Sequence, residues 1–347
     1  MTTHEFYMKR CIELAKNGLG TTYPNPLVGS VIVHDGKIIG EGWHKKAGEP
    51  HAEVNAVNSV KNKSLLKEAT IYVSLEPCSH FGKTPPCCDL IIANEIPNVV
   101  VGTVDPFAKV AGNGIKKLVE SGKNVTVGIL EDECNELNKR FFTFHQKKRP
   151  FIILKWAETA DGFIAPISRE EKSPVWITNP YSRQLVHKWR TEEQAILVGT
   201  NTVLDDNPKL DARDFSGNNP VRIVLDKSGK ISENYHVKNN SQKTIFITES
   251  ENFISTENCI YENAIFDIHL ISSICDILYK NDIQSVIIEG GSKTLQSFID
   301  ANLWDEARVF KGDTTFQNGI LAPNISGNPV AGFDIMNDEL KIFKNYD

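Results

Sequence analysis

Apolar and polar positions alternate along the first 130 residues in a way that predicts strands and helices in turn. Strands are predicted by apolar, β-branched runs at 28–33, 37–42, 70–75, 99–104 and 125–130. A tight Asp35-Gly36 turn joins the first two of these runs. Helices are predicted over 4–17, from near 51, over 87–95 and around 115–120. This alternation favours an α/β layer sandwich with a largely parallel sheet.

A second α/β pattern starts at Phe151, after the basic run Lys147-Lys148-Arg149-Pro150. Apolar runs predict strands at 151–156, 195–198, 221–225, 244–247 and 285–289. Helices are predicted over 180–190, with Pro180 in the first turn, and directly after Gly290-Gly291-Ser292. The polar stretch 231–243 is expected to be a solvated loop. We therefore expect two domains, 1–147 and 148–347.

Composition narrows the class of protein. A chain of 347 residues is too long for one ordinary core, which agrees with two domains. The formal charge of -6 opposes a large nucleic-acid-binding face, and the sequence has no apolar run long enough to span a bilayer. The first residues lack the features of a signal peptide. Seven cysteines, an odd number, suit metal ligation in a reducing compartment, so we expect a cytoplasmic protein.

A metal-binding motif stands in the first third of the chain. His51-Ala52-Glu53 is followed by Pro77-Cys78 and then by Cys87, a pattern typical of zinc-dependent nucleobase and nucleoside deaminases. One imidazole and two thiolates can hold one zinc ion and leave its fourth position open for water. Glu53 can then carry a proton from that water to the departing ammonia. The alternative is a closed structural site in which Cys88 or His80 supplies a fourth ligand.

The loop between the two thiols is unusually long, since the commoner deaminase motif is P-C-x-x-C. The segment from Pro77 to Cys88, P-C-S-H-x-G-x-T-P-P-C-C, resembles the bifunctional deaminase–reductases of riboflavin biosynthesis. Pro24-Asn25-Pro26 and Gly42-Trp43-His44 agree with the same family, and the resemblance covers nearly the entire chain. It implies a cytidine-deaminase-like α/β/α sandwich followed by a dihydrofolate-reductase-like α/β domain.

The resemblance assigns roles in the first domain residue by residue. It implies one Zn²⁺ per chain, and Glu53 as the catalytic proton carrier. The metal ligands it implies are His51, Cys78 and Cys87, and the contacts to the pyrimidine or its ribose phosphate are Asn25, His44, His80 and Lys83. After Asp105-Pro106 this chain continues with Phe107-Ala108, where the family often has Asn-Pro.

The second domain carries a weaker motif of its own. Glycines between a strand and a helix, as at Gly290-Gly291, suit either a phosphate site or a plain tight turn. A Rossmann domain is disfavoured, because the sequence has no G-x-G-x-x-G. The resemblance implies an NADPH-dependent reductase. The cofactor contacts it implies are Ala157, Trp176, Thr202, Asp206, Gly290, Gly291, Ser292, Lys293, Thr294 and Leu295, and the substrate contacts are Arg190, Leu210, Arg213 and Glu289.

These assignments predict two consecutive reactions on one small molecule. The first is deamination of 2,5-diamino-6-(5-phosphoribosylamino)pyrimidin-4(3H)-one. The second is reduction by NADPH of the ribosyl group of 5-amino-6-(5-phosphoribosylamino)uracil to ribityl. Either a protonated Lys155 or an acid such as Asp206 is expected to assist opening of the ribose ring, and the sequence leaves this choice open.

Other hypotheses remain open at this point. A deaminase with an impaired reductase domain is one, since Pro174 stands where the family usually has serine and Ser173 precedes it. A protein that binds or edits nucleic acid is another, opposed by the acidic charge. A non-catalytic zinc scaffold is the third. We expect a homo-oligomer, a dimer or a tetramer, with no membrane or nucleic-acid partner.

Overall fold

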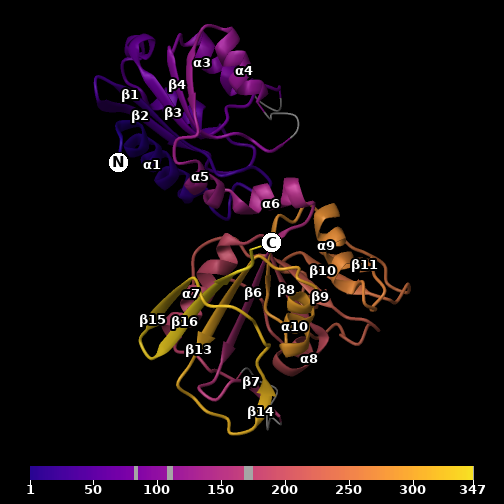
Figure 1. Cartoon of the computed structure of the whole chain (residues 1–347). Coiled ribbons are helices and arrows are strands. Elements are labelled where there is room, and N and C mark those ends of the chain that lie inside the picture. The colour runs from indigo at the N-terminus through magenta and orange to yellow at the C-terminus, as the bar shows by residue number, and fades with distance from the viewer. Residues whose placement is uncertain (82–84, 108–111, 168–174, 347) are drawn as a thin grey trace. The chain divides into compact units, whose positions relative to one another are not determined.

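The computed structural model describes residues 1–81, 85–107, 112–167 and 175–346 and divides into two compact units (Figure 1). The first unit is Met1–Lys148 and the second is Arg149–Asp347. The division falls within the basic run that precedes Phe151. Each unit has a sheet and hydrophobic clusters of its own.

A five-stranded mixed sheet forms the centre of the first unit, in the order β2-β1-β3-β4-β5. Its strands are β1 (Gly29–His34), β2 (Lys37–Trp43), β3 (Thr70–Leu75), β4 (Asn98–Thr103) and β5 (Asn124–Val127). β3, β4 and β5 are parallel, whereas β1 is antiparallel to both of its neighbours. The antiparallel β1–β2 pair agrees with the predicted Asp35-Gly36 turn, whereas the antiparallel pairing of β1 with β3 departs from the expected parallel arrangement. Asp35 and Gly36 both have positive φ, so they close a two-residue hairpin that forces β2 to run back along β1.

Helices cover both faces of this sheet. α1 (Thr3–Ala15) and α5 (Glu131–Leu137) contribute to the cluster on one face, and α2 (Ala52–Ser59), α3 (Cys87–Ala93) and α4 (Asn113–Glu120) to that on the other. The short helices η1 (Lys16–Gly18) and η2 (Lys63–Glu68) lie between elements, and α6 (Lys139–Lys147) ends the unit. Met8 and Cys11, three residues apart on α1, pack against the sheet on one face of that helix. The result is an α/β/α sandwich.

Nine strands form the sheet of the second unit, in the order β11-β10-β9-β8-β12-β6-β13-β16-β15. They are β6 (Phe151–Glu158), β8 (Ala195–Gly199), β9 (Val221–Leu225), β10 (Thr244–Thr248), β11 (Cys259–Asn263), β12 (Ser285–Ile288), β13 (Glu306–Lys311), β15 (Ala331–Ile335) and β16 (Asp338–Lys344). The strands from β11 to β13 are parallel, and β16 and β15 add an antiparallel edge. A separate pair joins β7 (Phe163–Pro166) to β14 (Gly319–Leu321).

Four helices pack on this second sheet. α7 (Pro180–Glu192) and α8 (Thr200–Asp206) contribute to clusters on one face, and α9 (Leu270–Lys280) and α10 (Ser292–Asp300) to that on the other. Both faces of β6 are buried, because Ile152 and Leu154 belong to one cluster while Phe151 and Ile153 belong to another. Throughout the described residues, every helix is too short or too polar to cross a membrane.

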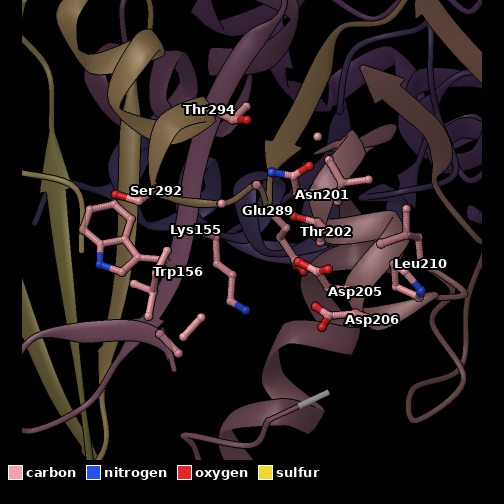
Figure 2. Close-up of a pocket in the computed structure, with 18 of the residues that line it drawn as sticks. Lys155, Trp156, Asn201, Thr202, Asp205, Asp206, Leu210, Glu289, Ser292 and Thr294 are labelled. Carbon is pink, nitrogen blue, oxygen red and sulfur yellow. The ribbon is translucent and has the colours of Figure 1, made fainter. Parts of the chain in front are cut away.

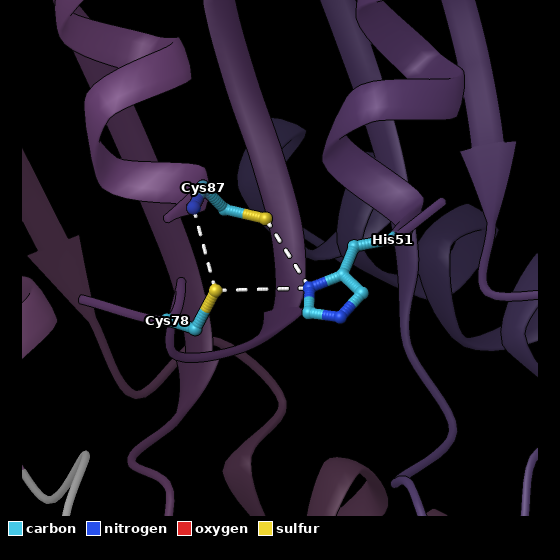
Figure 3. A group of neighbouring side chains, drawn as sticks. All are labelled: His51, Cys78 and Cys87. Carbon is cyan, nitrogen blue, oxygen red and sulfur yellow. Dashed lines mark hydrogen bonds between the residues drawn. The ribbon is translucent and has the colours of Figure 1, made fainter. Parts of the chain in front are cut away.

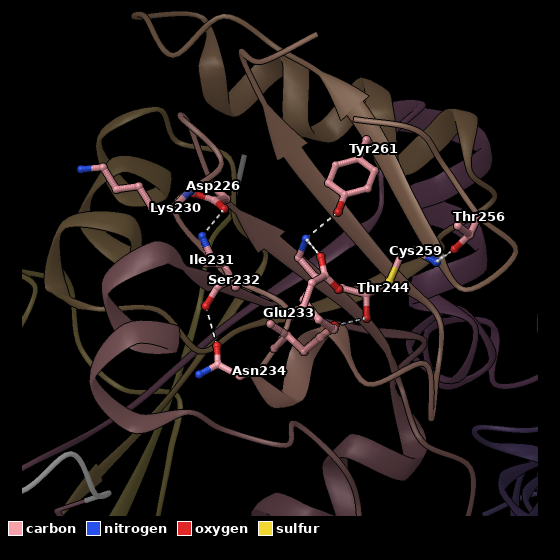
Figure 4. Close-up of polar contacts among 12 residues, drawn as sticks. Asp226, Lys230, Ile231, Ser232, Glu233, Asn234, Thr244, Thr256, Cys259 and Tyr261 are labelled. Carbon is pink, nitrogen blue, oxygen red and sulfur yellow. Dashed lines mark hydrogen bonds and ion pairs between the residues drawn. The ribbon is translucent and has the colours of Figure 1, made fainter. Parts of the chain in front are cut away.

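The stretch 231–243 is largely the exposed loop that its polar composition predicted, but part of it is anchored in the core. It contains the short helix η3 (His236–Lys238), in which Val237 and Lys238 are buried. Lys238 Nζ donates to the Tyr261 hydroxyl at 2.6 Å and to Glu233 at 3.1 Å, and it lies 4.8 Å from the centre of the Phe246 ring. Figure 4 shows Glu233 and Tyr261, the two residues to which Lys238 donates. Composition did not predict the burial of Lys238, because it does not show the partners that allow a charged side chain to be buried.

Candidate active sites

The first candidate site is a cluster of three metal-ligating side chains, His51, Cys78 and Cys87 (Figure 3). Their ligand atoms all lie within 4.8 Å of one another. Nδ1 of His51 is 3.7 Å from the Cys78 sulfur and 3.4 Å from the Cys87 sulfur. Two sulfurs and one imidazole nitrogen are a donor set that zinc prefers. Among the described residues the group has no fourth ligand, so a bound zinc would keep one position open.

Each ligand is delivered by the end of a regular element. His51 is the N-cap of α2, Cys87 is the first residue of α3, and Cys78 follows β3 by three residues. The backbone amide of Cys87 donates to the Cys78 sulfur at 3.3 Å. Hydrogen bonds from Cys87 and from His51 lower the pKa of the Cys78 thiol, whereas the hydrogen bond to Cys78 and burial raise the pKa of the Cys87 thiol. Cys78 is therefore the thiol of the pair that more readily becomes the thiolate that metal binding requires.

Glu53 lies beside the ligands and has only 3% of its surface exposed. Its carboxylate lies near enough to the Cys87 thiol for the two groups to influence each other's pKa. Burial, reinforced by the charge of Cys78, raises the pKa of Glu53 to about 7. A carboxyl group with this pKa can both accept and release a proton at neutral pH.

Two predicted substrate residues lie next to the cluster. The His44 ring is centred 5.4 Å from that of His51, and the amide nitrogen of Asn25 is 3.0 Å from His44 Nε2. His44 Nδ1 lies 3.2 Å from the Pro50 carbonyl oxygen, which can only accept, so Nδ1 carries the proton. Burial lowers the pKa of His44, which favours this neutral form. His80 is exposed on the following loop, and Lys83 lies outside the described residues.

The proposed fourth ligands of a closed site do not reach the cluster. Cys88 is fully buried in the core, and its thiol donates to the Pro77 carbonyl at 3.2 Å. His80 is exposed and is not one of the clustered ligands. This arrangement fits an open catalytic site better than a closed structural one.

Sequence reasoning missed Glu76, which supports the metal-binding loop from behind. Its buried carboxylate accepts hydrogen bonds from the backbone amides of Gly112 at 2.9 Å and Gly114 at 2.8 Å. A Cβ at Gly114 would lie 2.1 Å from the Pro77 carbonyl oxygen, so glycine is needed for this close approach. The N-terminus of α4 is thereby fixed against the segment that carries Cys78. The sequence did offer a signal for Glu76: an acidic residue stands directly after a buried strand, β3, and two residues before the metal ligand Cys78.

The second candidate site is a cavity of about 1300 Å³ in the second unit (Figure 2). It lies at the carboxyl ends of parallel strands β6, β8, β9 and β12, where open α/β sheets commonly bind ligands. Predicted residues that line it are Lys155, Ala157, Trp176, Arg190, Thr202, Asp206, Leu210, Arg213, Glu289, Gly290, Gly291, Ser292, Lys293 and Thr294. Leu295 is placed elsewhere, fully buried in the hydrophobic core.

One end of the cavity suits the phosphate groups of a dinucleotide. Gly291 is the N-cap of α10, and its lack of a side chain leaves the first amides of that helix uncapped. A Cβ at Gly291 would meet no atom within 4 Å, so the backbone there is open to a ligand. Helix N-termini with this exposure bind phosphate. The cavity and the turn therefore fit NADPH.

A buried ion pair also lines the cavity. Arg190 Nη2 is 2.7 Å from Glu289 Oε2, and Nη1 donates to the Asp211 carbonyl at 3.0 Å. Burial alone would raise the pKa of Glu289, but the charges of Arg190 and Lys155 lower it to about 2. Burial lowers the pKa of Lys155 from its ordinary value. Arg213, by contrast, is more exposed and pairs with Asp211 at 2.7 Å.

Several lining residues were not singled out from the sequence. Asn201 and Asp205 belong to α8 and line the cavity beside Thr202 and Asp206, as Figure 2 shows. The polar run from Thr200 to Pro208 could have indicated them. On a helix, Asn201 and Asp205 are four residues apart and lie on one face, as Thr202 and Asp206 do. His187, one turn before Arg190 on α7, also lines the cavity and was missed.

A buried arginine anchors the loop that carries Leu210. Arg222 donates to the carbonyl oxygens of His236 at 2.7 Å and Gln242 at 2.8 Å. Gln242 in turn donates to the Leu210 carbonyl at 3.2 Å. The wall of the cavity thus depends on the same 231–243 segment that composition assigned to solvent.

Comparison with known protein families matches each unit separately. Residues 1–103 match the cytidine and deoxycytidylate deaminase zinc-binding region. Residues 150–314 match the RibD C-terminal domain.

Individual relatives match the whole chain. The riboflavin biosynthesis protein RibD of Aquifex aeolicus is 40% identical over 97% of this chain and 93% of its own length. The RibD protein of Escherichia coli is 35% identical over 94% and 90%. A crystal structure from Thermotoga maritima, a diaminohydroxyphosphoribosylaminopyrimidine deaminase/5-amino-6-(5-phosphoribosylamino)uracil reductase, is 40% identical, with a TM-score of 0.88 over 99% of this chain and 98% of that one. The chain therefore belongs to the RibD family of riboflavin biosynthesis enzymes and carries both activities, a zinc-dependent deaminase and an NADPH-dependent reductase.

Proposed function

We propose that this chain deaminates 2,5-diamino-6-(5-phosphoribosylamino)pyrimidin-4(3H)-one and then reduces the ribosyl group of 5-amino-6-(5-phosphoribosylamino)uracil to ribityl. The observation that carries the proposal is the place of Glu53 against the sulfur of Cys87, beside a three-ligand cluster. The substrate assignment is supported by the Thermotoga maritima relative, whose two activities are named for these compounds.

In the first unit, Glu53 moves the proton. It takes a proton from the attacking water as the new carbon–oxygen bond forms, and it delivers a proton to the nitrogen that leaves as ammonia. The chemistry that zinc supplies when bound by His51, Cys78 and Cys87 is Lewis acidity, which lowers the pKa of a water molecule in its open position. Asn25 and His44 lie close enough to this cluster to orient the pyrimidine. His80 and Lys83 complete the proposed substrate contacts.

In the second unit, the protein positions the sugar. NADPH supplies the hydride that reduces C1′ of the opened ribose. Arg190 and Arg213 are proposed to hold the substrate phosphate, and Lys155 to donate a proton during ring opening. Lys155 qualifies because it lines the cavity, where burial lowers its pKa and the charges of Glu289 and Arg190 act on that pKa in opposite directions. The side chain of Leu295 packs in the core, so its proposed contribution to the cofactor turn comes through the backbone.

The remaining assignments follow the division of the chain. We assign the deaminase to residues 1–147 and the reductase to residues 148–347, with a boundary in the basic run before Phe151.

All seven cysteines are free thiols, which supports a reducing compartment such as the cytoplasm. A homo-oligomer, dimeric or tetrameric, acting on this small molecule is our proposal for the assembly.

The order of the reactions gives a direct test. The purified chain is supplied with the diaminopyrimidinone substrate, with and without NADPH, and ammonia and NADPH are followed together. Ammonia release is expected in both conditions, and NADPH oxidation only after ammonia has appeared. Oxidation of NADPH that precedes ammonia release would overturn the proposed order.

A further inference from the structure

Three buried polar atoms around the reductase cavity have no hydrogen-bond partner among the described residues. They are His187 Nδ1, Arg190 Nε and Glu289 Oε1, and their residues all line the cavity. Buried polar atoms are nearly always paired in folded proteins. Three such atoms around one cavity therefore point to a polar ligand that completes them. Arg190 and Glu289 already have proposed roles, but His187 has none.

His187 is held rigidly with one ring nitrogen already occupied. It lies three residues before Arg190 on α7, so both side chains are on one face of that helix. Only 5% of its surface is exposed. Nε2 lies 3.1 Å from a carboxylate oxygen of Asp214, whose own side chain is 53% exposed. A carboxylate can only accept, so Asp214 keeps the proton on Nε2.

The surroundings of His187 favour the neutral ring. Burial lowers the pKa of His187, and the positive charges of Arg190 and Arg213 act in the same direction. Asp214 and Glu289 oppose this shift but do not outweigh it. With Nε2 protonated and the ring neutral, Nδ1 carries a lone pair and can only accept a hydrogen bond.

We propose that His187 is a substrate-binding residue of the reductase site whose Nδ1 accepts a hydrogen bond from a hydroxyl group of the sugar. This inference rests on the proposed function, because it takes a sugar phosphate as the ligand. A phosphate group near neutral pH carries mostly negative charge and little proton to donate, so it suits the two arginines rather than a neutral acceptor. A sugar hydroxyl donates readily and satisfies Nδ1. Asp214 acts through the ring and is a positioning residue.

Binding of two probes distinguishes the hydroxyl contact from a phosphate contact. Ribose 5-phosphate and inorganic phosphate are titrated into the full chain saturated with NADPH, for the unaltered protein and for His187→Leu. We expect His187→Leu to weaken ribose 5-phosphate binding about tenfold and to leave phosphate binding unchanged. Equal weakening of both probes, or no weakening of either, would overturn the proposal. His269→Leu, at an exposed histidine of the same unit, is the matched control.

A spectroscopic measurement tests the tautomer without relying on activity or on a core substitution. The ¹⁵N chemical shifts of the His187 ring are expected to report a protonated Nε2 and an unprotonated Nδ1 at pH 7. Asp214→Ala should reduce the population of this tautomer and weaken ribose 5-phosphate binding about threefold. A protonated Nδ1 in the unaltered protein would contradict the acceptor role.

Failure of this inference can be told from failure of the proposed function. If the unaltered chain does not oxidise NADPH with 5-amino-6-(5-phosphoribosylamino)uracil, the proposed function is wrong. If it does, and His187→Leu reacts with the same KM and kcat, only the assignment of His187 is wrong. Loss of the sugar contact should raise KM more than it lowers kcat.

Discussion

The metal cluster of the first unit and the cavity of the second hold their functional groups in opposite ways. In the cluster, each ligand is hydrogen-bonded to another ligand, and the supporting Glu76 is saturated by backbone amides. In the cavity, side chains come from the ends of several strands and from α7, α8 and α10, which pack on both faces of the sheet. Three of their buried polar atoms stay without partners among the described residues. The first site is complete except for its ion, whereas the second needs its ligands to satisfy its own polar groups.

This contrast has a functional consequence. A site whose groups depend on one another should fail as a whole when a single member is changed. A site assembled from many separate contacts should lose binding in steps. Because each unit has its own sheet and clusters, damage to one activity should leave the other measurable in the same chain.

The largest effect is expected from removing one metal ligand. Cys78→Ser should abolish ammonia release and reduce bound zinc from one ion per chain toward none, because serine is a poor zinc ligand. Zinc content by mass spectrometry and ammonia release are the measurements. Cys88→Ser, at the neighbouring core thiol that does not reach the cluster, should keep both the zinc and the activity. Equal zinc loss in the two variants would mean that the ligand set is misassigned.

Glu53→Gln should separate catalysis from metal binding. Glutamine keeps the shape of the side chain but cannot carry a proton, so ammonia release should fall by about 10²- to 10⁴-fold. Bound zinc and NADPH oxidation with the deaminated substrate should stay unchanged. Turnover equal to that of the unaltered chain would show that another group moves the proton.

Arg190→Met tests the stepwise behaviour of the cavity. The change leaves the carboxylate of Glu289 buried without its 2.7 Å partner and removes a proposed phosphate contact. We expect kcat/KM for NADPH oxidation to fall about 30- to 1000-fold, with ammonia release intact. Lys188→Met, on an exposed position of the same helix, is the matched control. A comparable loss in the control would indicate damage to α7 rather than to the site.

The smallest effect is a change in the pH dependence of the reductase. Burial lowers the pKa of Lys155 below its ordinary 10.5, so the ammonium loses its proton as the pH rises through that lowered value. If the protonated form assists ring opening, NADPH oxidation should decline on the alkaline side, below pH 10.5. Lys155→Arg stays charged and should lack this alkaline decline while losing several-fold in rate. An identical decline in both proteins would assign the titration to another group.

The two sites also differ in how far the sequence predicts them. The deaminase ligands lie in one short stretch with fixed spacing, so the motif alone indicated the cluster. Glu76 escaped prediction because its partners, the amides of Gly112 and Gly114, are brought to it only by the fold. The Asp35-Gly36 turn correctly predicted the antiparallel β1–β2 pair, but the antiparallel pairing of β1 with β3 joins segments far apart in the sequence and was not predicted.

In the second unit, prediction of single residues relied on family resemblance. Strands were found from apolar runs, but α9 and the strands β13 to β16 were not predicted. In β13 the buried charged residues Glu306 and Arg308 interrupt the apolar run, whereas β14 to β16 mix exposed and partly or fully buried positions. Lys238 was assigned to solvent because composition does not reveal aromatic partners. A role for His187 could not be predicted from the sequence, because it depends on Asp214 and Arg190, which lie near His187 in the folded structure. The predictions that concern Ser173, Pro174 and Ala108 fall on residues outside those that the structure describes.

Selective removal of zinc tests the central claim most directly. The full chain is treated with a chelator, and ammonia release from the diaminopyrimidinone substrate is measured beside NADPH oxidation with 5-amino-6-(5-phosphoribosylamino)uracil. Our account predicts that chelation stops ammonia release, that added zinc restores it, and that NADPH oxidation continues throughout. Ammonia release that survives complete loss of zinc, or NADPH oxidation that stops with it, would contradict two sites with separate chemistry.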